Sequence, residues 1–175
     1  SRGPTSSPLQ NLQKPNITAP GSFIYAADLN RDTGVFGFGF KGGTSMSSPH
    51  ASGSAVLVRQ ANPDWTVSET KSAMQMTASR TGLKDDGTTP WDWDDVGNGR
   101  VDLNNAALAG LVMDETFTSY LAADPSDGGD VTTLNTPSIR NVDCSPSCSF
   151  TRTIRNTYDV ATDWTVTVES FGSDV

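Results

Sequence analysis

Apolar and polar positions change their spacing several times along the chain. Residues 1–21 are rich in Pro, Ser and Asn, which predicts an extended loop. The short apolar run at 22–27 predicts a buried strand. Phe36, Phe38 and Phe40 then alternate with glycine, which places three rings on one side of a strand. The rings could pack in a core or form a wall beside an active site, and the pattern allows both.

Three later segments have helical patterns. Residues 45–60 combine small residues with Val and Leu and predict a buried helix that packs closely on both sides. Thr66 and Glu69 have the spacing of a capping box, which predicts a second helix to about residue 78. Its role is expected to be scaffolding. An Ala-rich stretch at 104–111 predicts a third, short helix ending at a glycine.

The final third of the chain has a different pattern. Residues 114–137 carry Gly, Pro, Asp and Thr and resemble a linker or crossover. Trp164, Val166 and Val168 then alternate with polar residues, which predicts a half-buried antiparallel strand. Residues 150–154 predict an earlier partner strand. The change to a period of two indicates a strand-rich region.

Composition and charge narrow the classes of function. The 175 residues are 35% hydrophobic with 16 glycines, enough for a core, and only 18% are charged. The net charge of −8 disfavours binding to nucleic acid and to anionic membranes. No apolar run approaches the ~18 residues of a membrane span.

The strongest chemical signal lies at the start of the 45–60 helix. Gly42 and Gly43 can form a tight turn, and Ser45 follows where a helix presents unpaired N–H groups and partial positive charge. A serine there is a candidate nucleophile with an oxyanion site in its own backbone. The simpler interpretation is a helix N-cap, which stabilises by ~1 kcal/mol.

Three other catalytic or binding patterns fit less well. The spacing of Gly37 to Thr44 resembles a phosphate-binding loop, but Gly43 stands where the lysine is needed. A Gly-x-Ser-x-Gly nucleophile elbow would need glycine in place of Ser47. A Ser45–Lys41 dyad would cross two glycines and has no predicted geometry.

The run from Gly43 to His50 resembles the nucleophile motif of subtilisin-like serine proteases, Gly-Thr-Ser-Met-Ala-x-Pro-His, with Ser47 in place of the alanine. Flanking segments resemble the same family in the same order, at 1–4, 14–21, 62–65, 71–74, 97–102 and 109–112. Asn16 stands where the family has aspartate. The resemblance implies an α/β fold over 1–114, the C-terminal part of a subtilisin-like three-layer catalytic domain.

A weaker resemblance continues after residue 114. Residues 151–156 resemble the Thr-Arg-Thr-Val-Thr-Asn run of the fibronectin type III-like β-sandwich found in larger secreted subtilases. A complete sandwich takes ~100 residues. The resemblance therefore implies that 115–175 is the start of an incomplete all-β sandwich.

The resemblance also implies a set of roles. Ser45 would be the catalytic nucleophile, Gly43 and Thr44 would line the substrate floor, and Met46 would pack beside them. The family's catalytic Asp and His and its oxyanion Asn precede the serine, whereas the one histidine here, His50, follows it. We therefore expect the C-terminal piece of a larger, secreted serine endopeptidase, inactive alone.

The expected partners are polypeptide substrates and the remainder of the same protease chain. The alternative is a non-catalytic accessory module, in which residues 115–175 would dock a substrate or partner.

The two cysteines bear on the cellular compartment of the protein, and a group of aspartates bears on metal binding. Cys144 and Cys148 favour a small disulfide loop in an oxidising compartment over free thiols. A metal site would need two more ligands. No cofactor is required. Asp92, Asp94 and Asp95 offer oxygen ligands for Ca²⁺ but lack EF-hand spacing, and such an acidic loop can equally be solvated.

Overall fold

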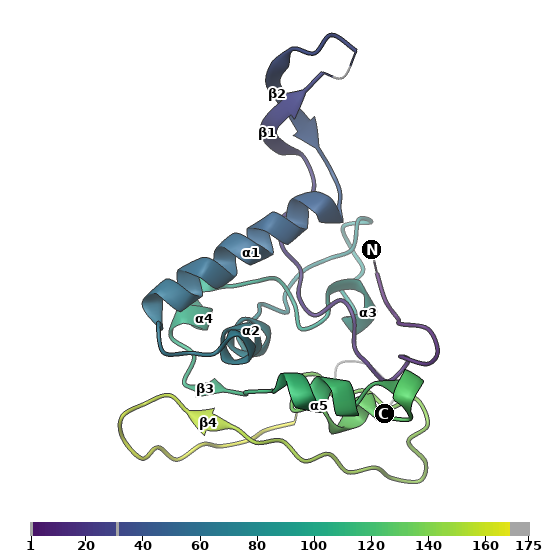
Figure 1. The fold of residues 1–175 in the computed structure, drawn as a ribbon, viewed down its shortest axis with the longest axis vertical. Helices are drawn as coiled ribbons and strands as arrows, with labels where there is room; N and C mark the ends of the chain where they lie inside the picture. The colour runs from purple at the N-terminus through teal and green to yellow at the C-terminus, as the bar shows by residue number, and fades with distance from the viewer. Residues whose placement is uncertain (1, 31, 169–175) are drawn as a thin grey trace.

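The computed structural model describes residues 2–30 and 32–168 (Figure 1). Helices and strands alternate irregularly along these residues. In chain order they are β1 Ile24–Leu29, β2 Phe36–Lys41, α1 Thr44–Ala61, α2 Val67–Met76, α3 Trp93–Val96, α4 Leu103–Ala107, β3 Leu111–Val112, α5 Phe117–Ala122, the 3₁₀ turns η1 Pro125–Asp127 and η2 Val131–Thr133, and β4 Arg155–Asn156.

The main core lies where α1, α2, α4 and β3 meet. Its buried members are Val58, Trp65, Ala73, Met74, Ala106, Ala109 and Val112. Helix α2 has the predicted capping box, because the Thr66 hydroxyl accepts from the Glu69 N–H and the Glu69 carboxylate accepts from the Thr66 N–H. Helix α4 ends at Ala107, earlier than the 104–111 pattern predicted, because the chain turns into β3 at Leu111.

Helix α1 confirms the helix predicted at 45–60, within one residue at each end. Its predicted burial on both sides is wrong. Ser54 and Val58 are buried against the core, whereas Val56 and Leu57 are exposed. The helix lies along one edge of the body (Figure 1), so among the described residues only one of its faces finds packing partners.

A β-hairpin projects from the body next to the start of α1 (Figure 1). Strands β1 and β2 pair antiparallel, with Ile24 opposite Lys41 and Leu29 opposite Phe36. The strand predicted at 22–27 exists but is shifted by two residues, and the prediction that it is buried is wrong. Phe36 is 83% exposed. Nothing among the described residues covers the hairpin, so the aromatic row forms no core contact with the body.

Residues 114–137, expected to be a linker, contain α5 and the two 3₁₀ turns. They enclose a second small core of Ala123, Val131 and Leu134.

The two strands predicted at 150–154 and 164–168 are not formed. In the C-terminal part up to residue 168, only β4 pairs, with β3 in antiparallel register. Val166 and Val168 are 88% and 94% exposed. A strand needs a neighbouring strand for its backbone hydrogen bonds, and the described residues supply one only at β4. An all-β sandwich is therefore not seen in the described residues after 114, and the domain boundary there remains a prediction.

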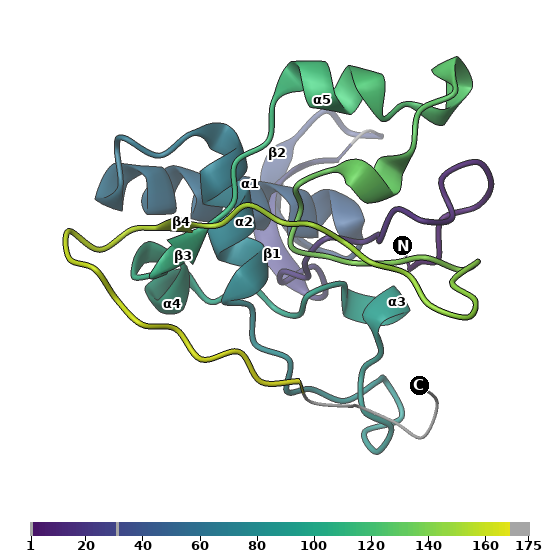
Figure 2. The ribbon, with the colours of Figure 1, turned by 90° about the horizontal axis from the view of Figure 1, so that it is seen from below.

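Residues 115–168 nevertheless pack on the earlier residues. After β4 the chain runs beside β3 and α4 (Figure 2). The Thr157 hydroxyl donates to the Ala109 carbonyl at 2.6 Å. A Cβ on Gly110 would lie 2.5 Å from the Trp164 ring, so this glycine permits the close approach of the C-terminal segment.

Candidate active site

The turn before α1 is held by glycine. Gly43 is the N-cap, with φ 146° in the region that favours glycine, and it provides no side-chain cap. Its N–H donates to the Gly21 carbonyl at 2.7 Å. This bond ties the turn to the N-terminal segment and fixes where α1 begins.

Ser45 is the second residue of α1 and its side chain is exposed. Its hydroxyl has no hydrogen-bond partner among the described residues, so the N-cap interpretation is wrong. The Met46 and Ser47 N–H groups donate to the Gly43 carbonyl at 3.0 and 3.3 Å. The N–H groups of Thr44 and Ser45 find no acceptor in the described part of the chain, which leaves two donors at the positive end of an 18-residue helix.

Ser47, the departure from the family motif, connects the helix to the N-terminal segment. Its hydroxyl donates to the Ala19 carbonyl at 2.8 Å. Gly21 also lies beside the first turn of α1, because a Cβ placed on Gly21 would lie 2.9 Å from the Gly43 oxygen. Local sequence patterns could not predict the Ser47–Ala19 contact because it joins residues 28 positions apart.

Neither basic side chain close in sequence can serve Ser45 as a base in this arrangement. His50 Nδ1 lies 2.8 Å from the Met46 carbonyl of its own helix. The Lys41 ammonium is paired with Asp28 at 2.8 Å, which argues against the Ser–Lys dyad. Met46 is partly buried beside Ser45. The substrate-floor roles of Gly43, Thr44 and Met46 stay predictions.

The disulfide is confirmed. Cys144 and Cys148 are bonded, with their Cα atoms 5.5 Å apart. Both cysteines of the chain form this disulfide, which excludes free thiols and a cysteine metal site in this structure.

The acidic residues proposed for calcium are each engaged elsewhere. Asp92 caps α3 and pairs with Lys84 at 2.6 Å. Asp95 pairs with Lys84 at 2.8 Å and with Arg2 at 3.1 Å, and Asp94 pairs with Arg140 at 2.6 Å. The described residues contain no converging group of three His, Cys, Asp or Glu side chains. As they lie, these carboxylates do not fit a calcium site, and calcium binding remains an untested prediction.

Residues 1–109 match the family model described as the Subtilase family. The chain belongs to the subtilase family. It is 37% identical over 155 residues to Subtilisin-like protease SBT4.3 of Arabidopsis thaliana, covering 83% of this chain and 21% of that protein. It is 32% identical over 200 residues to SBT3.10 of the same plant, covering 97% of this chain and 26% of the relative.

This subtilase also resembles a protease of known structure. Fervidolysin from Fervidobacterium pennivorans, a keratinolytic enzyme related to subtilisin, matches with a TM-score of 0.43 and 25% identity, over 54% of this chain and 15% of that one. The chain spans about a fifth to a quarter of the length of the two plant relatives. None of the helices in the described part is long and apolar enough to cross a membrane.

Proposed function

We propose that this subtilase chain carries the nucleophile of a serine endopeptidase and that Ser45 is that nucleophile. One observation carries the proposal. The Ser45 hydroxyl is exposed and unpartnered at the start of α1, beside two N–H groups without acceptors in the described structure. The names of the relatives, subtilisin-like proteases, support the same reaction class.

In the proposed reaction, Ser45 Oγ forms a bond to the scissile carbonyl carbon and gives its proton to a histidine base. The negative charge then develops on the carbonyl oxygen, where the Ser45 N–H can donate to it. Collapse of this intermediate breaks the peptide bond, and the histidine returns the proton to the leaving amine. Gly43 and Thr44 would lie along the substrate, with Met46 packed behind them.

The base must come from outside these 175 residues, because the one histidine they contain is His50. We infer that the catalytic Asp and His and the oxyanion Asn belong to a preceding part of the same protease. The substrates would be polypeptides, and the disulfide supports a secreted protein. Residues 115–175 would begin the fibronectin type III-like domain, a proposal supported by the 151–156 resemblance.

A fluorophosphonate probe tests the nucleophile. We expect label on Ser45 in a chain that includes the preceding protease residues, and none on the 175-residue protein alone. Ser45→Ala should abolish labelling and peptide hydrolysis in the longer chain. Ser48→Ala is the matched control, because Ser48 is exposed in the same helix.

Labelling that persists in Ser45→Ala would refute the assignment. A longer chain that is folded but takes no label would favour the accessory-module alternative.

A further inference from the structure

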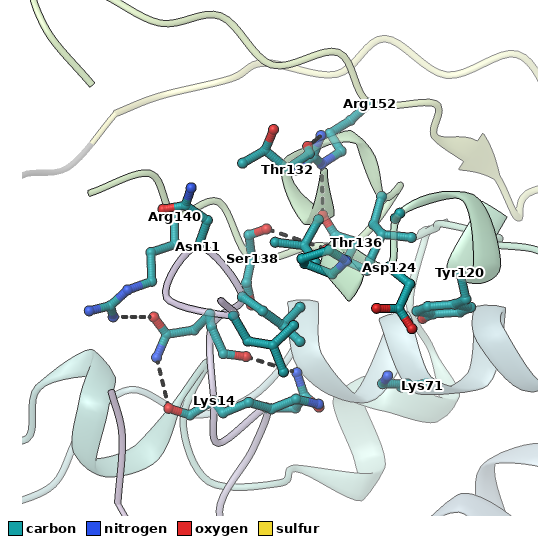
Figure 3. Close-up of a pocket in the computed structure, with 18 residues that line it drawn as sticks. Asn11, Lys14, Lys71, Tyr120, Asp124, Thr132, Thr136, Ser138, Arg140 and Arg152 are labelled. Carbon is teal, nitrogen blue, oxygen red and sulfur yellow. Dashed lines mark hydrogen bonds between the residues drawn. The ribbon is translucent and has the colours of Figure 1, made fainter. Parts of the chain in front are cut away.

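A cavity lined by both apolar and charged side chains lies apart from the turn that carries Ser45. It has a volume of about 240 Å³ and is enclosed by the N-terminal segment, α2, α5 and the residues that follow α5 (Figure 3). None of its lining residues belongs to the 42–50 run. The side chains of Lys14 and Lys71 reach it from the N-terminal segment and from α2, and Arg152 also lines it.

The lysines of the chain divide into two groups. Lys41 and Lys84 are paired with aspartates. Lys14 and Lys71 form no ion pair within the described residues, and both line this cavity. Lys14 Nζ donates to the Asn16 side-chain oxygen at 2.7 Å, and Lys71 Nζ lies 5.9 Å from the centre of the Tyr120 ring. The cavity thus holds two ammonium groups without ion-pair partners in the described structure, although the chain as a whole is acidic.

Nearby acidic groups do not neutralise these lysines. The Asp124 carboxylate also lines the cavity, but it forms no ion pair with Lys14 or Lys71 in the described structure, and its hydrogen-bond donors are the N–H and the hydroxyl of Ser126. Glu115 does not line the cavity, and it accepts from the N–H groups of Thr116 and Asn135.

The arginines are also engaged. Arg152 Nε donates to the Thr136 carbonyl at 2.9 Å, and Arg140 is already paired with Asp94. Even with Arg140 paired, Lys14, Lys71 and Arg152 outnumber Asp124, the one carboxylate among the lining residues, so the cavity keeps an excess of positive charge.

The energetics of the two lysines agree with this geometry. Desolvation, followed by the charge of Lys71, lowers the pKa of Lys14. Desolvation likewise lowers the pKa of Lys71. Both ammonium groups are thus less stable here than in water, and a bound anion would favour their charged forms.

We propose that this cavity binds a small tetrahedral oxyanion of the phosphate or sulfate class, held by Lys14 and Lys71. Each ammonium can donate charge-assisted hydrogen bonds to such an anion. Because one lysine belongs to the N-terminal segment and the other to α2, the anion would join these two parts of the chain.

Isothermal titration calorimetry with inorganic phosphate and with sulfate, at constant ionic strength in chloride, tests the site. We expect saturable binding of one anion per chain. Lys14→Gln and Lys71→Gln should each weaken it by about tenfold or more, as expected for the loss of a hydrogen bond to a charged group. Lys71→Arg keeps the charge and should keep the binding.

Arg59→Gln is the matched control. Arg59 is an exposed cation in the last turn of α1 and does not line the cavity, so its loss should leave the affinity unchanged. Circular dichroism would establish that each variant is folded. The proposal is overturned if neither anion binds saturably, if acetate binds and the tetrahedral anions do not, or if Arg59→Gln weakens binding as much as Lys71→Gln.

Discussion

At the scale of single residues, Gly21 controls the geometry of the nucleophile turn. A Cβ at this position would lie 2.9 Å from the Gly43 oxygen and 3.1 Å from the Ser47 Cβ. Both neighbours are held by hydrogen bonds to the N-terminal segment, so neither can move away without breaking one.

We predict that Gly21→Ala lowers the free energy of unfolding by about 1–3 kcal/mol, the usual cost of overpacking. Gly53→Ala in α1 is the control. Nothing lies within 4 Å of its added methyl group, and alanine is the better helix former, so stability should rise by up to ~1 kcal/mol. Urea denaturation measures both. Equal effects of the two substitutions would contradict the prediction.

Ser47 gives a prediction against the family pattern. Ser47→Ala restores the residue usual in the motif but removes the hydrogen bond to the Ala19 carbonyl. We expect a loss of about 1 kcal/mol in the free energy of unfolding, typical of one hydrogen bond. Ser48→Ala removes an exposed hydroxyl and should stay within about 0.5 kcal/mol of the parent. An unchanged denaturation midpoint for Ser47→Ala would show that the bond contributes nothing.

Single residues also show what the sequence could predict. The position of Ser45 and the Cys144–Cys148 bond followed from short local patterns. The arginine partners of Asp94 and Asp95 did not, because Arg140 and Arg2 approach them from distant parts of the chain. An acidic loop looks the same in sequence whether its carboxylates hold a metal ion, water or arginine.

At the scale of secondary-structure elements, a buried carboxylate connects α2 to β4. Glu69 is 5% exposed and accepts from Arg155 Nε and from the Thr66 N–H. Arg155 first, and then the Thr66 N–H, hold the pKa of Glu69 below its ordinary value of 4.5. The unfolded chain therefore binds more protons at this group as the pH falls past 4.5.

The stabilisation from Glu69 should thus be present above about pH 4.5 and be lost as the pH falls towards the lowered pKa of the folded state. Arg155→Met should flatten this part of the dependence of unfolding free energy on pH, whereas Arg59→Met, remote in the last turn of α1, should not. Denaturant titrations between about pH 3 and pH 6 would measure it. Parallel curves for the parent and Arg155→Met would argue against the pair as its source.

Elements were predictable to the extent that their signals are local. The capping box of α2 and the glycine turn before α1 each depend on only a few neighbouring residues, and both helices formed where expected. Strands depend on partners elsewhere in the chain. The alternation at 164–168 suits a strand, but no neighbouring strand lies beside it in the described structure, and the hairpin's aromatic row has no covering layer there.

At the scale of the whole molecule, residues after 114 share packing and hydrogen bonds with those before it. The Ser68 hydroxyl donates to the Glu115 carbonyl at 2.9 Å, Thr157 bonds Ala109, and Arg155 bonds Glu69. These contacts join the two regions whose patterns differ in sequence.

We therefore predict one cooperative thermal transition for the 175-residue protein. Differential scanning calorimetry should give a calorimetric enthalpy close to the van't Hoff enthalpy, with a ratio of about 1. Two separate transitions would show instead that the contacts across residue 114 do not couple the regions. A version with Arg155→Met and Thr157→Val provides the comparison, since it removes two of the contacts and should lower the transition temperature.

The projecting hairpin has a mechanical consequence. Strand β2 ends at Lys41, and only Gly42 and Gly43 separate it from α1. Apart from the two chain neighbours of Gly42, no atom of the described residues lies closer than 3.8 Å to a Cβ placed on Gly42, so side-chain packing at this residue does little to fix the angle between the hairpin and α1. The hairpin therefore meets α1 at a pair of glycines, and Gly43 is held there by the hydrogen bond from its N–H to the Gly21 carbonyl. A displacement of the hairpin would reach the body through two short connections, residues 21–23 and 42–43, and both lie at the start of α1.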